Sequence, residues 1–444
     1  MYIQKVEIKN IRSISHFEMT FPKPAGWHVL IGDNGAGKST IVRAIAATLI
    51  GPEEIAAVLP VWEEWLSQSE KEGTILLELE RDAKLDSISQ TRPPTIQTIK
   101  NVFELKRNGR IEFKSNIFEK TMNPRNFNWG NNKGWFSVAY GPFRRFTGGN
   151  DKWNKVFYSA PKAGAHLSVF GEDIALTEAL DWLKELDRKR LKQKENHQIS
   201  VGVEEPLTKY ISESEFIFES IKTFINASGL LPHHAHFDSV NIEGDLIFKD
   251  GNGLPIKIVQ MSDGYRSILS LTFELIRQLV NTYSAHTVFK EIRKGKLETM
   301  KIDLPGVVLI DEIDAHLHPT WQTRIGQWFT KYFPNIQFIV TTHSPLVCRA
   351  CENGSIWRLA APGSENESGE ITGIDKDKLI FGNILDAYST EVFGQSPVRS
   401  AKTDEKAARL GQLDMRSAFG KITEQEEKER QHLQFTLSTN ATIN

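Results

Sequence analysis

The sequence has little of what marks secreted, membrane-spanning or strongly basic proteins. Only two cysteines occur in 444 residues, too few for a disulfide framework, which favours a reducing compartment. The formal net charge is −2, so any contact with nucleic acid has to be a local patch. No apolar run approaches the roughly 20 residues that span a bilayer, and the opening MYIQKVEIKN alternates like a strand, unlike a signal peptide. We therefore expect a cytoplasmic protein with no membrane partner.

What the sequence does contain is a regular succession of strand-like and helical patterns. Alternating, strand-like runs fill most of the first 145 residues, and the pattern over residues 172–228 is helical with a polar break. Buried strands then alternate with helices between residues 306 and 344, which predicts a parallel α/β core. We expect one domain over 1–361, with 172–228 as a compact helical insertion, and a charged, mainly helical C-terminal extension over 362–444.

A phosphate-binding motif lies between a predicted strand and a predicted helix. The stretch GDNGAGKST fits G-x-x-x-x-G-K-[ST] in the context that this motif needs, so an ordinary glycine turn is the weaker alternative. The backbone N–H groups can surround phosphates, Lys38 can reach the β- and γ-phosphates, and the Ser39 hydroxyl can ligate Mg²⁺. The predicted ATP-binding residues are Gly32, Asp33, Asn34, Gly35, Ala36, Gly37, Lys38, Ser39 and Thr40.

Two later strand ends carry polar groups suited to ATP hydrolysis. The apolar run in GVVLIDEID ends at Asp311 and Glu312. Asp311 would hold Mg²⁺ through water, and Glu312 could take a proton from the attacking water as general base. An acidic turn after a buried strand is the alternative for this pair. In FIVTTHSP, His343 ends the next apolar strand, where it is well placed to sense a γ-phosphate.

A polar run, QMSDGYRS, stands directly before a strongly apolar helix. Taken alone it predicts an ordinary helix start, capped by Ser262 or Asp263. Together with the other motifs, however, it resembles the signature motif of ABC-type ATPases, which lies between the P-loop and the paired acids. This resemblance implies that Ser262 and Gly264 bind the phosphate of a nucleotide held by a partner subunit, through the positive end of a helix. It also implies a homodimer of heads, or a higher oligomer, closed around ATP.

The resemblance extends to particular branches of that family. The opening IQKVEIKNIRSISHFEMTF resembles the first strands of SMC-, RecF- and OLD-like heads, in which a basic residue at the position of Arg12 reaches nucleotide phosphates. Over about residues 1–400 the chain resembles the PtuA-like ATPases of Septu antiphage systems, on the motifs AYGPFRR, SDGYRS, DAHLHPTWQ, FPNIQFIVTTHSP and FGQSPVRS. The implied fold is an ABC-type ATPase head with a parallel P-loop core, an antiparallel β subdomain and a helical lobe.

The implied function is that of an ATP-hydrolysing subunit in a defence complex whose separate HNH-type nuclease does the cutting. A RecF-like DNA-repair ATPase that binds DNA is the first alternative. A nucleic-acid-binding scaffold with a vestigial ATPase is the second, and the intact Lys38, Asp311 and Glu312 disfavour it. The polar extension over 362–444 is a candidate docking surface for the nuclease.

Two groups of positively charged residues each have two interpretations. The strand WFSVAY is not followed by a clear Q-loop glutamine, which puts that Mg²⁺ contact in doubt. Either Tyr140, Arg144 or Arg145 occupies that corner, or the two arginines are a solvated basic pair. The run KELDRKRLKQK could touch a phosphate backbone, but a solvated helix face is the favoured interpretation.

Three clusters of metal-ligating residue types have better structural explanations. Cys348 and Cys351 have C-x-x-C spacing, but one pair cannot close a four-ligand zinc site, so helix packing is favoured. The loop LPHHAHFD, with ligand types over 233–238, lacks a spaced partner cluster. Asp375 and Asp377 mimic a D-x-D pair, yet no acidic strand end precedes them and too little chain follows for a TOPRIM domain. We therefore expect no nuclease domain in this chain.

Overall fold

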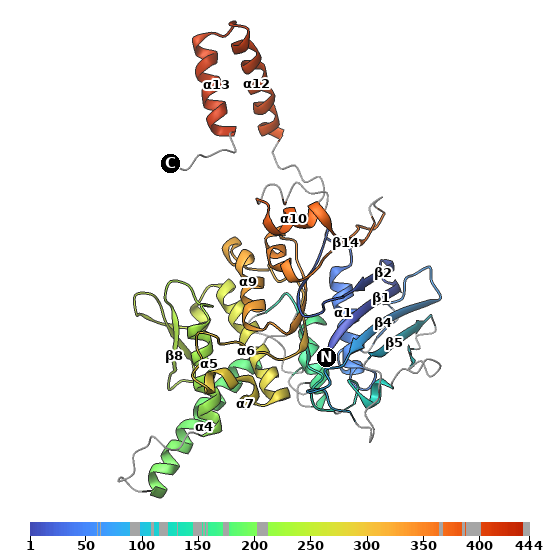
Figure 1. The fold of residues 1–444 in the computed structure, drawn as a ribbon, viewed down its shortest axis with the longest axis vertical. Helices are drawn as coiled ribbons and strands as arrows, with labels where there is room; N and C mark the ends of the chain where they lie inside the picture. Colours follow the sequence, from blue (N-terminus) through green and yellow to red (C-terminus); the bar gives the residue numbers. More distant parts are fainter. Residues whose placement is uncertain are drawn as a thin grey trace. The chain divides into compact units, whose positions relative to one another are not determined.

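The described part of the chain falls into two compact units, Met1–Gly382 and Asn383–Asn444 (Figure 1). The first unit extends past the predicted boundary at residue 361, because β14 (Gly369–Ile371) pairs with a core strand and α10 (Gly373–Phe381) packs on the same unit. Among the described residues of both units, no helix is long and apolar enough to cross a membrane. The structure, a computed structural model, describes residues 1–59, 61–62, 64–88, 98–107, 111–114, 123–130, 132–144, 153, 156, 159–171, 177–201, 212–363, 367–383, 387 and 401–437.

The core of the first unit is a six-stranded sheet that is parallel except at one edge. The strand order is β14–β13–β3–β12–β11–β7, and the edge strand β14 is antiparallel to its neighbour. The central strands are apolar and buried almost throughout, as expected for parallel strands covered on both faces. This is the parallel P-loop core that the sequence predicts. Its further strands are β3 (Gly26–Gly32), β7 (Ser137–Tyr140), β11 (Gly306–Ile310), β12 (Ile336–Thr341) and β13 (Ile356–Leu359).

A five-stranded antiparallel sheet forms the predicted β subdomain. Its order is β2–β1–β4–β5–β6, and Lys5 of β1 lies opposite Thr20 of β2. Along β4, buried side chains alternate with partly exposed ones, so one face of the sheet turns to the core. That face joins α1 (Lys38–Ile50) in one hydrophobic cluster, which fixes the P-loop helix between the two sheets. The strands are β1 (Tyr2–Ile11), β2 (Ile14–Thr20), β4 (Glu72–Glu80), β5 (Thr98–Lys106) and β6 (Ile111–Lys114).

The remaining elements of the first unit are helices and one small sheet. The predicted helical insertion contains α4 and α5, which pack on each other, and α4 also packs on α6 (Figure 1). A three-stranded antiparallel sheet, β8–β10, precedes α6 in the chain. These elements are α1 (Lys38–Ile50), α3 (Pro161–His166), α4 (Thr177–Val201), α5 (Glu213–Ala227), β8 (His236–Val240), β9 (Leu246–Lys249), β10 (Pro255–Lys257), α6 (Asp263–Tyr283), α7 (Ala285–Val288), α8 (Lys290–Arg293) and α9 (Pro319–Tyr332).

The second unit contains a charged helical hairpin, α12 (Ala401–Ala418) and α13 (Glu424–Leu437). Leu413 and Leu433 are buried in this unit, while most other described side chains of the hairpin are exposed or half-buried. Ion pairs also join the two helices, Arg409 with Glu429 at 2.9 Å among them. The hairpin therefore has a very small core of its own, as the highly charged sequence predicts.

Two buried histidines should make the first unit sensitive to mild acid. His28 and His166 are buried, and burial is the main cause that lowers the pKa of each to about 4. An unfolded histidine titrates near 6.5, so the unfolded chain binds more protons between these values, and stability is lost as pH falls through this window. Each histidine should remove about 2 kcal/mol of unfolding free energy between pH 7.5 and 5. Thermal midpoints of the wild type and His166→Phe at both pH values test this, and an equal pH-dependent loss in both proteins would contradict it.

Candidate nucleotide site

The predicted motifs meet at one edge of the parallel sheet. The strands β3, β12, β11 and β7 are consecutive neighbours that run in the same direction. Their carboxyl ends lead, in that order, into the P-loop, His343, the Asp311–Glu312 pair and the segment Gly141–Arg144. Ligand sites in open α/β sheets form at this edge.

Glycine geometry shapes the P-loop. Gly35 and Gly37 have φ angles of 82° and 101°, in the left-handed region that glycine adopts without strain. Gly37 is also the residue from which α1 starts. A Cβ on Gly37 would lie 3.1 Å from Ile14 Cγ1, so the β1–β2 turn, which carries Arg12 and Ser13, lies against the loop.

Lys38 lies beneath this loop, close to the acidic turn after β11. Its Nζ donates hydrogen bonds to the carbonyl oxygens of Gly32 at 2.7 Å and Asp33 at 3.0 Å, and the residue is 6 % exposed. Burial lowers the pKa of Lys38, and nearby carboxylates, first Asp311 and then Glu312, oppose that shift. The structure therefore brings Lys38 together with Asp311, the predicted Mg²⁺ ligand, and Glu312, the predicted general base.

A threonine that the sequence analysis did not single out holds the acidic pair. Thr341, the last residue of β12, donates from Oγ1 to Asp311 Oδ1 at 2.6 Å and accepts from the Glu312 N–H at 2.8 Å. Asp311 is 1 % exposed. Glu312 is half-buried with φ 48°, a left-handed backbone that non-glycine residues adopt mainly where the surroundings impose it, often at functional sites.

A second threonine–carboxylate contact organises the loop of His343. Thr342 Oγ1 donates to Asp314 Oδ1 at 2.6 Å, and the His343 N–H donates to Asp314 Oδ2 at 3.4 Å. The His343 side chain is exposed beside this contact. The sequence does not reveal this role of Asp314, the third acid of DEID, because its partners lie about 30 residues away in the chain.

The signature stretch QMSDGYRS starts α6, but not as an ordinary capped helix. The helix begins at Asp263, and the Ser262 side chain makes no capping hydrogen bond. The interpretation of Ser262 as a simple cap is therefore wrong. At Gly264 a Cβ would lie 2.9 Å from the His316 carbonyl oxygen, so this glycine permits close packing on the turn after β11. Contact of Ser262 and Gly264 with a partner's nucleotide stays a prediction.

Arg12 lies next to the P-loop, on the β1–β2 turn. Its guanidinium stacks over the Trp65 ring, with 4.8 Å between Cζ and the ring centroid. Burial, followed by the charge of Arg43, lowers the pKa of Arg12. The residue lines a cavity of about 720 Å³ together with Ser13 and Ser15. Its predicted contact with nucleotide phosphates stays a prediction.

The corner after β7 is occupied by buried side chains. Tyr140 and Arg144 are 1 % and 4 % exposed, so the interpretation of Arg144 as part of a solvated basic pair is wrong. Arg144 cannot ligate Mg²⁺, because it carries a positive charge and no acceptor. Arg145 lies outside the described residues, as does the FGQSPVRS motif.

The residues at this edge fit a magnesium nucleotide. Nothing lies within 4 Å of the position that a Cβ on Gly35 would take, which leaves the loop backbone open to a ligand. The Ser39 hydroxyl and the Asp311 carboxylate are oxygen donors of the kind that Mg²⁺ prefers, and Lys38 supplies the phosphate-binding charge. These residues would hold ATP and Mg²⁺; their assignment stays a prediction.

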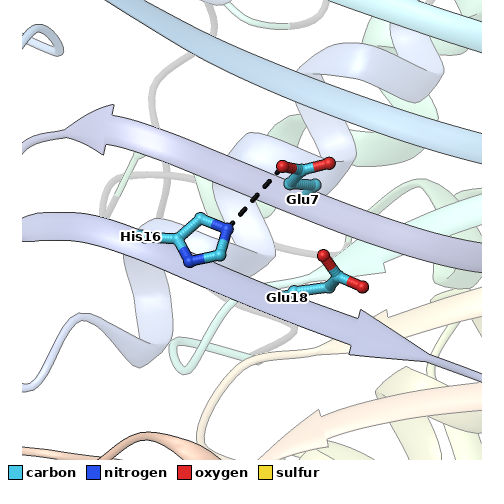
Figure 2. A group of neighbouring side chains, drawn as sticks. All are labelled: Glu7, His16 and Glu18. Carbon is cyan, nitrogen blue, oxygen red and sulfur yellow. Dashed lines mark ion pairs between the residues drawn. The ribbon is translucent and has the colours of Figure 1, made fainter.

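Among the described residues, one group has metal-ligand chemistry outside this edge. Glu7 and His16 point toward each other on β1 and β2, with Glu18 beside them (Figure 2), and their ligand atoms lie within 4.8 Å of one another. Lys5 already pairs with Glu18 at 3.0 Å, and Lys9 pairs with Glu7. The group is therefore a neutralised surface ion-pair cluster, whose charge does not require a cation.

The weaker candidates from the sequence are also accounted for. The histidines over 233–238 are not part of that group. The predicted loop is wrong for His236 and Asp238, which lie on β8, and Asp238 pairs with Lys249 at 3.0 Å. Cys348 and Cys351 are free and buried, as a packing role predicts, and burial raises the pKa of both thiols.

The basic run on α4 is balanced by acidic neighbours, which supports its interpretation as a solvated helix face. These ion pairs include Lys184–Asp181, Arg188–Glu185, Lys189–Glu185, Arg190–Asp187, Arg190–Glu219 and Lys194–Glu215.

The sheet order and the motifs gathered at its carboxyl edge define an ABC-type ATPase head, with the antiparallel subdomain and helical lobe that the sequence predicts. A family model described as "AAA domain, putative AbiEii toxin, Type IV TA system" matches residues 28–349, and the chain belongs to this family.

The comparisons confirm the resemblance to PtuA-like ATPases. The Septu protein PtuA of Bacillus mycoides (strain KBAB4) is 28 % identical over 380 residues, which cover 83 % of this chain and 41 % of that protein. The Retron Ec83 probable ATPase of Escherichia coli is 36 % identical over 168 residues, covering 37 % of this chain and 28 % of that protein. The chain thus spans about two fifths of the length of that PtuA.

Among solved structures, an SmcHead bound to the C-winged helix domain of ScpA aligns with a TM-score of 0.47 and 18 % identity. The alignment covers 85 % of this chain and 99 % of that chain.

Proposed function

We propose that this chain binds and hydrolyses ATP at the carboxyl edge of its parallel sheet. The observation that carries the proposal is the buried Lys38 ammonium beside the carboxylates that follow β11. ATP hydrolysis by P-loop proteins needs this combination, because a lysine binds the β- and γ-phosphates while acids nearby handle Mg²⁺ and water.

Each residue at the edge has a role in this proposal. Ser39 and Asp311 hold Mg²⁺, which when bound neutralises charge developing on the phosphates. Glu312 accepts a proton from the attacking water. His343 contacts the γ-phosphate side of the site from the end of β12, and Thr341 fixes both the Asp311 carboxylate and the Glu312 amide.

The proposed site is shared between two heads. The start of α6 carries free N–H groups and a partial positive charge, which suit a phosphate. Its Ser262 hydroxyl makes no capping bond within the chain, so it is available to a ligand. In this proposal Ser262 and Gly264 of one head close the ATP site of the other head.

The biological setting we propose is antiphage defence. The similarity to Septu PtuA over 83 % of the chain supports this setting, and the retron ATPase is a second relative over a shorter stretch. Within that setting, the head regulates a separate HNH-type nuclease subunit. Exposed apolar side chains on the hairpin, such as Met415 and Phe419, support docking of that subunit on the C-terminal extension.

The purified chain should hydrolyse ATP with Mg²⁺ yet leave DNA uncut with Mg²⁺ or Mn²⁺. The carboxylates that the structure gathers at the sheet edge serve nucleotide chemistry, and Asp375 on α10 lies near Lys378, with 3.7 Å between the charged atoms. Phosphate release and plasmid cleavage, measured on the same preparation, test this prediction.

The matched controls are the variant Lys38→Ala and the double variant Asp375→Ala, Asp377→Ala. Cleavage that survives the first and is abolished by the second would place a nuclease in this chain.

A further inference from the structure

The guanidinium of Arg144 has an unusual position just behind the acidic turn. It is buried, and its hydrogen bonds to the described residues go to neutral carbonyl and hydroxyl oxygens. Nη1 donates to the carbonyl oxygens of Gly141 at 2.9 Å and Asp311 at 2.8 Å, and Nη2 to that of Glu312 at 2.9 Å. Burial lowers the pKa of Arg144 to about 10, while the nearby carboxylates, Asp311 first, oppose the shift.

These hydrogen bonds fix the backbone around Glu312. Nη2 also reaches the carbonyl oxygen of Ile313 at 3.4 Å, so one side chain binds three successive carbonyls of the turn. Glu312, the middle residue, has the left-handed backbone described above. Such a backbone persists only where surrounding contacts over-determine it, and Arg144 provides several of them.

The same guanidinium reaches the signature helix. Its Nε donates to Ser267 Oγ at 3.2 Å, near the start of α6, and Ser270 Oγ lies 3.5 Å from the Arg144 carbonyl oxygen. The close approach of Gly264 to the His316 carbonyl oxygen is a second link between α6 and the turn. The acidic turn after β11 and the start of α6 are therefore both hydrogen-bonded to the buried Arg144 guanidinium.

We infer that Arg144 is a positioning residue that couples the start of α6 to the backbone of Glu312. It acts through Glu312, because its own donors are engaged by protein oxygens. When the start of α6 binds a phosphate, the hydrogen bond between Arg144 and Ser267 transmits this binding to the turn that carries Glu312. The turn is then held in the conformation that hydrolysis needs. This inference rests on the proposed function, because it assumes that Glu312 handles the water and that α6 meets a nucleotide.

A lysine cannot replace Arg144 in this role. Arginine offers five donors in a rigid planar fork, whereas lysine carries a compact point charge on a flexible stem. Arg144→Lys keeps the buried positive charge but cannot bind the carbonyls of Asp311 and Glu312 and the Ser267 hydroxyl together. It therefore separates the geometry of the fork from the charge.

The first test uses amide hydrogen exchange on the full chain without nucleotide. In Arg144→Lys, exchange should rise together in two segments, 305–317 and 262–270, while that of β3 stays at the wild-type level. The control is Lys162→Met, because Lys162 also donates to two backbone carbonyls, those of Asn128 and Gly130, both at 2.7 Å. The control should leave both segments unchanged.

The second test uses steady-state ATP hydrolysis. Arg144→Lys should lower kcat by about tenfold or more while KM changes less than about threefold, since transition-state positioning is lost and binding is not. In a chain that already carries Glu312→Gln, Arg144→Lys should lower kcat little further, because both changes act through the Glu312 side chain.

The outcomes separate the inference from the proposed function. The coupling would be overturned if Arg144→Lys speeds exchange in the acidic turn alone or throughout the unit. It would also be overturned if exchange in both segments stays at the wild-type level. A full additional loss of kcat in the double variant would also overturn it. If the wild type does not hydrolyse ATP, the proposed function fails, and the exchange experiment still decides whether Arg144 joins the two segments.

Discussion

Replacement of Lys38 by alanine is expected to weaken ATP binding by about 10²- to 10³-fold, which removes high-affinity binding. Lys38 is the buried cation of the P-loop, and its Nζ donates hydrogen bonds to the carbonyl oxygens of Gly32 and Asp33. Without it, the phosphates would lose their charge partner while the carboxylates after β11 remain nearby. Equilibrium titration with a fluorescent ATP analogue measures the change directly.

Lys162→Ala is the matched control for this experiment. Lys162 is half-buried, donates to two backbone carbonyls and has a pKa lowered by burial, as Lys38 does, but it lies on α3 away from the P-loop. Its loss should leave ATP affinity unchanged. Wild-type affinity in a folded Lys38→Ala protein would refute the assignment of the P-loop.

Exchange of Glu312 for glutamine is expected to preserve ATP binding and to slow hydrolysis by about 10²- to 10⁴-fold, or about 3 to 5 kcal/mol of barrier. The amide has nearly the same shape but cannot take a proton from water. The contacts of the Glu312 backbone with Thr341 and Arg144 do not involve the side chain and should persist. Single-turnover hydrolysis separates the chemical step from binding.

Glu178→Gln provides the isosteric control, since it neutralises a half-buried glutamate on α4 whose pKa is raised to about 7, chiefly by burial. That variant should hydrolyse ATP at the wild-type rate. If Glu312→Gln does the same, Glu312 is structural and another group positions the water.

The P-loop and the acidic strand end could be predicted from sequence because their chemistry is local. The motif GDNGAGKST carries its own turn and helix start, and an apolar strand delivers Asp311 and Glu312 to a fixed edge. The parallel direction of β11 and β12 follows from the same alternation of strands and helices, whereas the place of β3 beside β12 is seen only in the fold. Such short-range signals need no knowledge of distant partners.

Contacts between distant segments could not be predicted in the same way. Thr341 meets Asp311 across 30 residues, and Arg144 meets the Asp311 carbonyl across 167. In the sequence Arg144 belongs to a basic pair, a pattern that usually indicates exposure, and only the fold shows that it is buried. The unit boundary at Gly382 depends on β14, which pairs with β13, and β13 in turn pairs with β3 near the start of the chain.

Gly264 shows how a residue can be singled out for one reason and constrained by another. In the sequence it completes a Ser-x-Gly helix start, which suggests a phosphate contact. In the structure it also permits the approach of α6 to His316. Both constraints favour glycine, so the residue type alone could not reveal the packing.

The central claim, that two heads share each ATP site, is tested most directly by mixing two inactive variants. Ser262→Arg should fill the phosphate position offered to the partner and leave its own P-loop intact, whereas Lys38→Ala does the reverse. A heterodimer of the two carries one complete site, so an equimolar mixture should regain activity up to about a quarter of the wild-type rate if chains pair at random. The rate falls below that limit to the extent that the Glu312 turn needs α6 of its own chain to bind a phosphate.

The control mixes Lys38→Ala with a chain that carries both changes, which leaves no complete site in any pairing. ATP hydrolysis in the first mixture and none in the control is the result that a shared site predicts. No recovery in the first mixture, with subunit exchange demonstrated, or full activity of Ser262→Arg alone, would contradict it.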